Sequence, residues 1–188
     1  MHIPVGKLGE QHRHMMTAAQ RDYDQVSALL ATLKPGSVLD IGCGVAGIDI
    51  LFGNIGGLID IHLMDGTKFR SEHESWVTRA PEPWADVHHA AELVRMNVPK
   101  NVLVFAHEAT HKLDVKVDLL WSSQSWGWHY PVSVYLELAK RCLKAGGRIV
   151  MDIRRKTDGE DEMNLGGFRT VAIVWQTNKG QRLIFGRD

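Results

Sequence analysis

The sequence predicts an α/β fold in which helices cover both faces of a mostly parallel sheet, and the sheet ends in an antiparallel hairpin. Three observations lead to this expectation. Apolar stretches typical of strands alternate with segments of helical periodicity between residues 17 and 153. A glycine-rich loop directly follows the first of these stretches. Two extended patterns, at 168–176 and 182–185, are joined by Thr-Asn-Lys-Gly, which is a hairpin signal.

The first half of the chain alternates helix and strand. Residues 17–33 carry apolar side chains on one helical face, and a Pro-Gly pair ends this predicted helix. The apolar run 38–41 predicts a buried strand that turns sharply into a short helix at 48–55. A second apolar run, 58–64, predicts a strand that ends at Asp65.

The second half begins with a polar segment, 66–84, that contains two prolines. This segment either lies over the active site or packs on the surface as a plain connection, and the sequence leaves both alternatives open. The next elements are expected at 85–97 (helix), 102–106 (strand), 117–121 (strand), 131–142 (helix) and 148–153 (strand). Residues 154–167 are rich in charge and glycine, so we expect the last crossover helix to be short or absent.

Composition limits the domain organisation and the partners. With 188 residues, of which 44% are hydrophobic, the chain suits one domain with a sizeable core. Residues 1–16 mix proline, glycine and histidine without periodicity, which predicts an N-terminal arm before a single domain at 17–188. The 22 basic and 22 acidic side chains balance, which disfavours a nucleic-acid partner because no overall positive field would attract phosphates.

Cysteine usage and hydropathy indicate the compartment. Cys43 lies in the glycine loop and Cys142 in a predicted helix, so a disulfide framework is not expected and a reducing cytoplasm fits. The chain opens without a charged-then-apolar leader, and no apolar run approaches the ~20 residues that cross a bilayer. We therefore expect a cytoplasmic protein with no membrane contact.

The glycine loop has the spacing of a nucleotide-binding turn, with Gly42, Gly44 and Gly47 in the pattern G-x-G-x-x-G. Glycines permit the tight turn and let backbone N–H groups approach a nucleotide closely. Asp65 follows roughly 20 residues later, where an acid that binds ribose hydroxyls belongs. Asp40 precedes the first glycine by two positions, and a carboxylate there suits an ammonium or sulfonium ligand better than a pyrophosphate. A cationic ligand is therefore favoured over a dinucleotide.

The segment 38–47, V-L-D-I-G-C-G-V-A-G, resembles the first motif of class I S-adenosylmethionine-dependent methyltransferases. Residues 143–150, L-K-A-G-G-R-I-V, resemble the L-K-P-G-G-R segment of that family, with Ala145 where proline is usual. The resemblance covers residues 17–185. It implies a Rossmann-like methyltransferase fold with seven strands, the last ones forming an antiparallel hairpin, and S-adenosyl-L-methionine as the cofactor.

The resemblance also implies a set of cofactor contacts. Asp40 would lie near the methionine part of the cofactor, and Asp65, followed by Gly66, would accept hydrogen bonds from the ribose hydroxyls. The other implied contacts are the backbone of Gly42, Cys43 and Gly44 at the turn, Glu108 and Ala109 beside adenine, and Ser122 near the methionine part. The alternative for Asp65 and Glu108 is that each is an ordinary solvated acid at the end of a strand.

Residues 122–131 leave the carboxyl end of the fourth predicted strand, where ligands bind in open parallel sheets. His129 is the candidate base for a hydroxyl acceptor, because an unperturbed pKa near ~6.5 leaves imidazole largely neutral in the cell. Trp126, Trp128 and Tyr130 are candidates for stacking on the acceptor. Alternatively, the rings pack in the core and His129 is an ordinary loop histidine. His107 or His111 is the second choice of base.

The same segment bears on the acceptor. It lacks the Asn/Asp-Pro-Pro-aromatic pattern of enzymes that methylate amino groups of nucleic acids, and it lacks a Pro-Cys nucleophile, so base methylation is disfavoured. Its S-W-x-x-H-Y-P pattern is similar to sugar O-methyltransferases of bacterial polysaccharide clusters. Asp118 and Asp152 show no compact ligand spacing, and we expect no metal.

The sequence therefore predicts an S-adenosylmethionine-dependent methyltransferase that acts on a hydroxyl of a small acceptor, with a sugar as one candidate. Two alternatives stay open: a non-catalytic module that binds the cofactor as an accessory subunit, and an enzyme that methylates RNA or protein. An open acceptor cavity would favour the enzyme over the module, and a basic stripe around residues 122–131 would favour RNA or protein.

Overall fold

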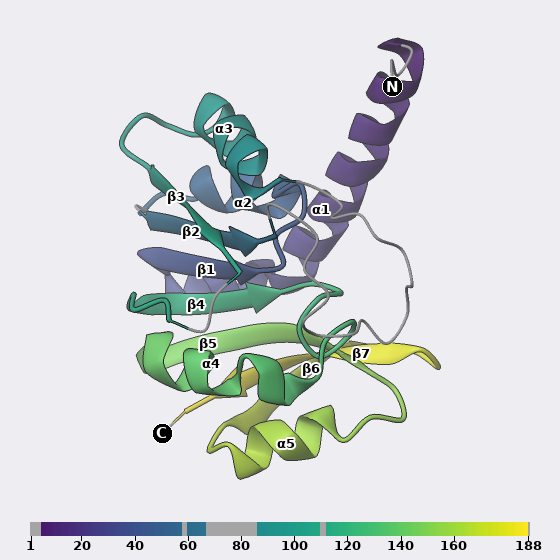
Figure 1. Ribbon diagram of the computed structural model, residues 1–188, viewed down its shortest axis with the longest axis vertical. Coiled ribbons are helices and arrows are strands. Elements are labelled where there is room, and N and C mark those ends of the chain that lie inside the picture. The colour runs from purple at the N-terminus through teal and green to yellow at the C-terminus, as the bar shows by residue number, and fades with distance from the viewer. Residues whose placement is uncertain (1–4, 58–59, 67–85, 110–111, 188) are drawn as a thin grey trace.

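The computed structural model describes residues 5–57, 60–66, 86–109 and 112–187. At its centre is a seven-stranded sheet with the order β3-β2-β1-β4-β5-β7-β6 (Figure 1). The strands are β1 (Ser37–Ile41), β2 (Asp60–Asp65), β3 (Leu103–Glu108), β4 (Val117–Ser122), β5 (Leu143–Arg154), β6 (Arg169–Gln176) and β7 (Gly180–Gly186). The helices are α1 (Val5–Leu33), α2 (Gly47–Gly53), α3 (Val87–Asn97), the 3-10 turn η1 (Val132–Val134), α4 (Leu136–Cys142) and α5 (Gly159–Leu165).

The strand directions confirm the predicted topology. Strands β1 to β5 pair in parallel, whereas β7 runs antiparallel to both β5 and β6. The backbone N–H of Thr177 donates to the carbonyl of Gly180 at 2.8 Å and closes the predicted hairpin. The carboxyl ends of the parallel strands therefore meet at one edge of the sheet, where ligands bind in such folds.

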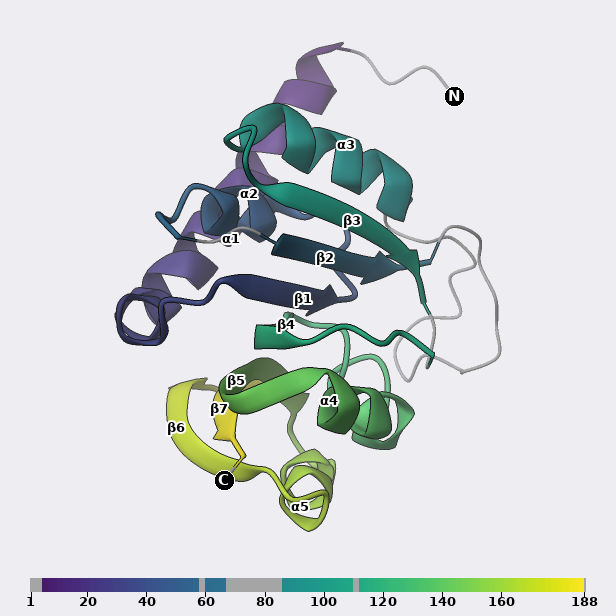
Figure 2. The same ribbon diagram turned by 90° about the vertical axis from the view of Figure 1, so that its left-hand side faces the viewer.

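Two helical layers cover the sheet. Side chains alternate between the faces of a strand, so Val38 of β1 packs with residues of α1, α2 and α3, while its neighbour Leu39 packs with η1, α4 and α5. Figure 2 shows the two layers on opposite sides of the strands. Every residue of β1 is buried, including Ser37 and Asp40, which explains why apolar side chains occur on both faces of this strand and do not simply alternate with polar ones.

Two element boundaries differ from the expectations by five residues or more. Helix α1 begins at Val5, so it continues through most of the segment 1–16 that we expected to form an arm. Figure 1 shows that this end of α1 projects away from the sheet. Strand β5 begins at Leu143 and not at residue 148, because Leu143 already pairs with Val117 before a register shift in β4. The last crossover helix, α5, is present and has seven residues.

Some of the chain lies outside this description. Apart from Gly66, the predicted loop 66–84 is not among the described residues, and neither is His111. Within the ranges given above, no helix combines the length and the apolar character that crossing a membrane requires.

Candidate active site

The glycine turn joins β1 to α2 and is anchored to β2. Gly42 and Gly44 adopt positive φ angles of 76° and 54°, which glycine adopts without a steric penalty. The N–H groups of Gly42 and Cys43 donate to the carbonyl of Met64 at 2.7 and 3.3 Å. A Cβ added to Gly44 would meet no atom of the described residues within 4 Å. Within that part of the chain, the backbone at Gly44 is uncovered, as a close-approaching ligand requires.

Asp65 ends β2 and lies directly beside this turn. Its Oδ2 accepts a hydrogen bond from the N–H of Gly44, and its Oδ1 accepts one from the N–H of Gly66, each at 2.7 Å. Burial raises the pKa of Asp65, although the two N–H donors oppose this rise. An ionised carboxylate offers about four acceptor positions, so two hydroxyl groups can still bind to it.

Asp40 lies beneath the turn, on the face of β1 that α2 covers. Only 2% of its surface is exposed, and Asp49 of α2 is 0% exposed. Oδ1 of Asp40 and both carboxylate oxygens of Asp49 have no hydrogen-bond partner among the described residues. Burial, followed by the nearby charges of Asp49 and Asp65, raises the pKa of Asp40 well above its usual range. This buried and uncompensated acidic site suits a cationic ligand.

The other predicted cofactor contacts have mixed environments. Glu108 is exposed and pairs in register with Asp65, and the N–H of Ala109 donates to the carbonyl of Asp65 at 2.9 Å. Both residues thus lie at the same strand ends as Asp65. Burial raises the pKa of Cys43, which keeps its thiol protonated. Ser122 is buried: its hydroxyl donates to the carbonyl of Ile41 at 2.8 Å and accepts from the N–H of Trp126 at 3.0 Å.

The loop after β4 is seated on the glycine turn. A Cβ added to Gly42 would overlap the side chain of Ser125. The carbonyl of Ser125 in turn accepts hydrogen bonds from the N–H groups of Trp128, His129 and Tyr130 at 2.8–3.1 Å. Sequence reasoning missed Ser125, because nothing in a lone serine indicates that it packs on a glycine 83 positions earlier. The loop after β4 and the glycine turn are therefore in direct contact.

The three aromatic rings of this loop lie in different environments. Trp126 is 0% exposed, donates from Nε1 to the carbonyl of Val132 at 2.8 Å, and packs edge-to-face on Tyr135. This core position differs from the expected stacking on an acceptor, because no part of the ring is accessible. Trp128 packs against Gly180 of the hairpin. Tyr130 is half-buried, and burial followed by the charge of Asp65 raises its pKa.

His129 is half-buried, and its Nδ1 has no hydrogen-bond partner among the described residues. Burial, followed by the positive charge of Arg154, lowers the pKa of His129 and keeps the ring neutral. A neutral imidazole with a free ring nitrogen can accept a proton. The alternative base, His107, instead lies 3.0 Å from His62 across β2 and β3. His107 is thus paired with another histidine, whereas His129 has an unpartnered but buried Nδ1 in the described chain.

The negative charge of a second buried acid, Asp152 of β5, is neutralised by a buried arginine. Arg182 of β7 is 1% exposed and binds Asp152 through Nε at 2.6 Å and Nη2 at 3.0 Å. The same guanidinium donates to Asp22 and Gln25 of α1 at 3.1 Å and to Ser123 at 3.0 Å. Burial lowers the pKa of Arg182, but its bonds to the two aspartates outweigh this effect and raise it. Burial also raises the pKa of Asp152, yet the short bidentate geometry favours the ionised pair.

The two candidate metal ligands have structural roles. Asp152 is held by Arg182, and Asp118 accepts hydrogen bonds from the N–H groups of Gly36 and Ser37 and from Lys144 at 2.9–3.1 Å. Across the described ranges, no three His, Cys, Asp or Glu side chains are grouped so that they could hold a metal ion.

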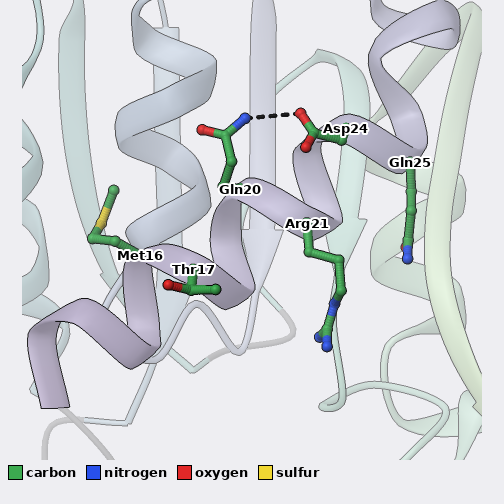
Figure 3. A pocket seen from close by; sticks show the side chains of 6 residues that line it. All are labelled: Met16, Thr17, Gln20, Arg21, Asp24 and Gln25. Carbon is green, nitrogen blue, oxygen red and sulfur yellow. Dashed lines mark hydrogen bonds between the residues drawn. The ribbon is translucent and has the colours of Figure 1, made fainter. Parts of the chain in front are cut away.

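An open groove runs along α1 (Figure 3). Its described lining residues are Met16, Thr17, Gln20, Arg21, Asp24 and Gln25. Within it, Gln20 donates to Asp24 at 2.8 Å. None of these residues belongs to the glycine turn or to β2. The groove is nevertheless linked to the Arg182 network through Gln25.

Solved methyltransferases share this architecture. Magnesium protoporphyrin IX methyltransferase from Synechocystis PCC 6803, with bound SAH, matches with a TM-score of 0.65 and 15% identity over 100% of this chain and 90% of its own. A methyltransferase from Pyrococcus furiosus matches with a TM-score of 0.56 and 15% identity, over 89% of this chain and 81% of its own. Ribosomal protein L11 methylase from Lactobacillus delbrueckii subsp. bulgaricus matches with a TM-score of 0.53 and 15% identity, over 81% of this chain and 70% of its own.

No family model and no curated protein sequence matches the chain. At these identities the structural likeness establishes the fold, and the strand order with its antiparallel end agrees with it. The chain has the seven-stranded Rossmann-like fold of these solved methyltransferases.

Proposed function

We propose that this protein is an S-adenosylmethionine-dependent methyltransferase that methylates a hydroxyl group of a small acceptor. The observation that carries the proposal is the pairing of Asp65 with the glycine turn. Oδ2 of Asp65 lies 2.7 Å from the backbone nitrogen of Gly44, and no described residue covers the Cβ position of Gly44. An acid that can bind two ribose hydroxyls is thereby fixed beside a backbone that a nucleoside can approach closely.

The charge of the site favours a cationic cofactor. A buried carboxylate is costly unless an opposite charge compensates it. Asp40 and Asp49 have unpartnered oxygens in the described chain, and a sulfonium or ammonium group near the turn would offset their negative charge. A pyrophosphate would be repelled there. The solved neighbour from Synechocystis, which contains SAH, supports this choice of cofactor.

The loop after β4 would hold the acceptor. When bound, S-adenosylmethionine supplies an electrophilic methyl group. His129 would accept the proton of the acceptor hydroxyl as the new C–O bond forms and the bond between sulfur and the methyl group breaks, because the lowered pKa of its ring keeps the imidazole neutral. Tyr130 lines the side of the site that faces Asp65. The packing of Ser125 on Gly42 holds this loop against the cofactor turn, which brings base and methyl group together.

A sugar is the acceptor that we propose first, because the S-W-x-x-H-Y-P segment at 125–131 resembles sugar O-methyltransferases. The fold does not select the acceptor by itself, since the solved neighbours are named for a porphyrin and for a ribosomal protein. A screen for methyl transfer to glycans, phenols, RNA and protein distinguishes these classes. Cofactor binding without transfer to any of them would indicate the accessory module.

The first experiment is calorimetric titration of the protein with S-adenosylmethionine and with NAD⁺. We expect binding of the first ligand only. The Asp65→Asn variant should bind it at least about tenfold more weakly, which is about 1.4 kcal/mol, because an amide is a poorer acceptor for ribose hydroxyls than a carboxylate. Asp60→Asn, at the opposite end of the same strand, is the matched control and should bind like the wild type. Equal affinity of both variants would contradict the proposal.

A further inference from the structure

Three buried polar side chains, each with at least one atom that has no hydrogen-bond partner among the described residues, share one layer between the sheet and α2. They are Asp40 of β1, Asp49 of α2 and Trp121 of β4, each at most 2% exposed. Asp40 pairs in register with Trp121, so their side chains lie on the same face of the sheet. Phe52, one turn after Asp49 on α2, packs edge-to-face on Trp121 with ring centroids 5.5 Å apart. The polar groups are thus enclosed by packed aromatic rings.

The two carboxyl groups interact directly. Asp49 shifts the pKa of Asp40 both through its charge and through a side-chain hydrogen bond, which one shared proton would supply. Two close carboxylates with little solvent cannot both be ionised, so the pair retains a proton. Among the described residues, the other titratable groups that face the pair are Asp65 and Cys43, and neither brings positive charge. Arg182 stacks on the ring of Trp121 at 4.9 Å but is bound to Asp152.

A purely structural explanation of Asp49 is weak. An acid in the first turn of a helix stabilises the helix dipole, but this role is usually filled by an exposed side chain. Asp49 is 0% exposed, and both its oxygens lack a partner in the described chain. Its neighbours on the same buried side of α2 are apolar, namely Ile48 and Phe52. A buried polar group of this kind in a native fold calls for a ligand or a proton.

We propose that Asp49 is a positioning residue of the cofactor site, where the Asp40–Asp49 pair holds one proton in the free protein and releases it when a cationic ligand binds at the glycine turn. The inference rests on the proposed function. On binding, the O–H bond of the protonated carboxyl group breaks and its proton passes to the buffer. The positive charge of the ligand then takes over the neutralising role of that proton. Asp49 acts through Asp40, since Asp49 itself is fully enclosed.

This arrangement makes affinity for the cofactor depend on pH. Below the pH at which the pair loses its proton, affinity for a cationic ligand should rise about tenfold per pH unit, the slope for one released proton. A neutral ligand that offers the same adenosine and ribose groups should show no such dependence. In Asp49→Asn the amide donates to an ionised Asp40, so the dependence should be lost and binding near pH 6 should exceed that of the wild type.

The test uses calorimetric titration of the full chain in two buffers of different ionisation enthalpy, between pH 6 and 8. The ligands are S-adenosylmethionine and 5′-methylthioadenosine, which lacks both the sulfonium and the ammonium group. We expect release of close to one proton with the first ligand and none with the second. Asp49→Asn should release far less than the wild type, and Asp161→Asn, an exposed acid of α5, should behave like the wild type. If Asp49→Asn does not fold, Asp49→Leu takes its place in the titration, with the same expected loss of proton release.

The outcomes separate this inference from the proposed function. If both ligands bind the wild type without proton release, or if Asp49→Asn retains the full pH dependence, the inference is wrong and the proposed function stands. If neither ligand binds, the proposed function is wrong and the inference falls with it. Proton release with S-adenosylmethionine that disappears in Asp49→Asn supports both.

Discussion

The molecule contains two buried acidic centres on the same face of one sheet, and they are compensated very differently. At the first centre, Asp152 is bound by Arg182, which also reaches Asp22 of α1. At the second, Asp40 and Asp49 face each other without a partner cation in the described chain. The ring of Trp121 belongs to both neighbourhoods, since Arg182 stacks on it and Asp40 is its register partner.

The contrast supports a structural role for the Arg182 centre and the ligand-binding role that we propose for the Asp40–Asp49 centre. The Arg182 network ties α1, β5, β7 and the start of the loop after β4 into one unit, and every guanidinium nitrogen has a hydrogen-bond acceptor. The Asp40–Asp49 pair links β1 and α2, and it lies beneath a turn that no described residue covers at the Cβ position of Gly44. A buried charge that the chain leaves uncompensated is where an external cation can contribute.

The largest effect on stability is expected from Arg182→Met. This change removes the cation and leaves Asp152 and Asp22 with unpaired charge in a buried setting, which should cost about 3–5 kcal/mol of unfolding free energy. Urea denaturation measures it. The exposed Arg187→Met is the control and should change stability by less than about 0.5 kcal/mol. A loss below about 1 kcal/mol for Arg182→Met would mean that the first centre is not structural.

A smaller loss of unfolding free energy is expected for substitutions in the glycine turn, which lies above the Asp40–Asp49 pair. Gly44→Ala should cost about 1–2 kcal/mol, since only the left-handed backbone opposes it. Gly42→Ala should cost at least about 1 kcal/mol more, because the added Cβ also overlaps Ser125. Urea denaturation of the two variants measures the difference. Equal losses would show that the loop after β4 does not rest on the turn.

Asp49→Asn should stabilise the protein, by about 1–2 kcal/mol at pH 8. Burial raises the pKa of Asp49 from its ordinary value to about 7 in the folded state. The protonated side chain is tolerated at low pH, and stability is lost as the pH rises from about 4 through about 7. The advantage of the variant should therefore grow over that window and stay constant above it. Thermal unfolding between pH 4 and 8 measures this, and a constant difference at every pH would contradict it.

The smallest effect on stability is expected from His129→Gln. The ring is half-buried and its Nδ1 bonds to no described residue, so unfolding free energy should change by less than about 0.5 kcal/mol. Turnover should nevertheless fall by roughly a hundredfold or more, with cofactor affinity unchanged, because only the base is removed. Methyl-transfer assays and cofactor titration together measure this. Unchanged turnover would exclude His129 as the base.

The fold, and the position of Asp65 beside the glycine turn, were predictable because their signals are local. A continuous apolar run followed by spaced glycines predicts a buried strand and a turn, and an acid at the end of the next run predicts Asp65. The acceptor half was less predictable. A tryptophan in the core and a tryptophan at a ligand have the same sequence signature, which is why Trp126 was misplaced.

The contacts around the two buried acidic centres could not be predicted from the sequence, because they join residues that no local pattern connects. Asp49 lies between apolar neighbours in a short helix, and the sequence does not show that it faces Asp40. Arg182 is 30 positions from Asp152 and 160 from Asp22, so no spacing rule connects them. The early start of α1 was hidden by Gly6 and Gly9, which are poor helix formers.

A crystal structure of the protein with S-adenosylhomocysteine would show where an adenosyl ligand binds. We expect both ribose hydroxyls within about 3 Å of the Asp65 carboxylate and the ammonium group on the side of the turn nearest Asp40. A ligand bound in the groove along α1, or a turn closed to the ligand by the loop after β4, would contradict the site described for this chain.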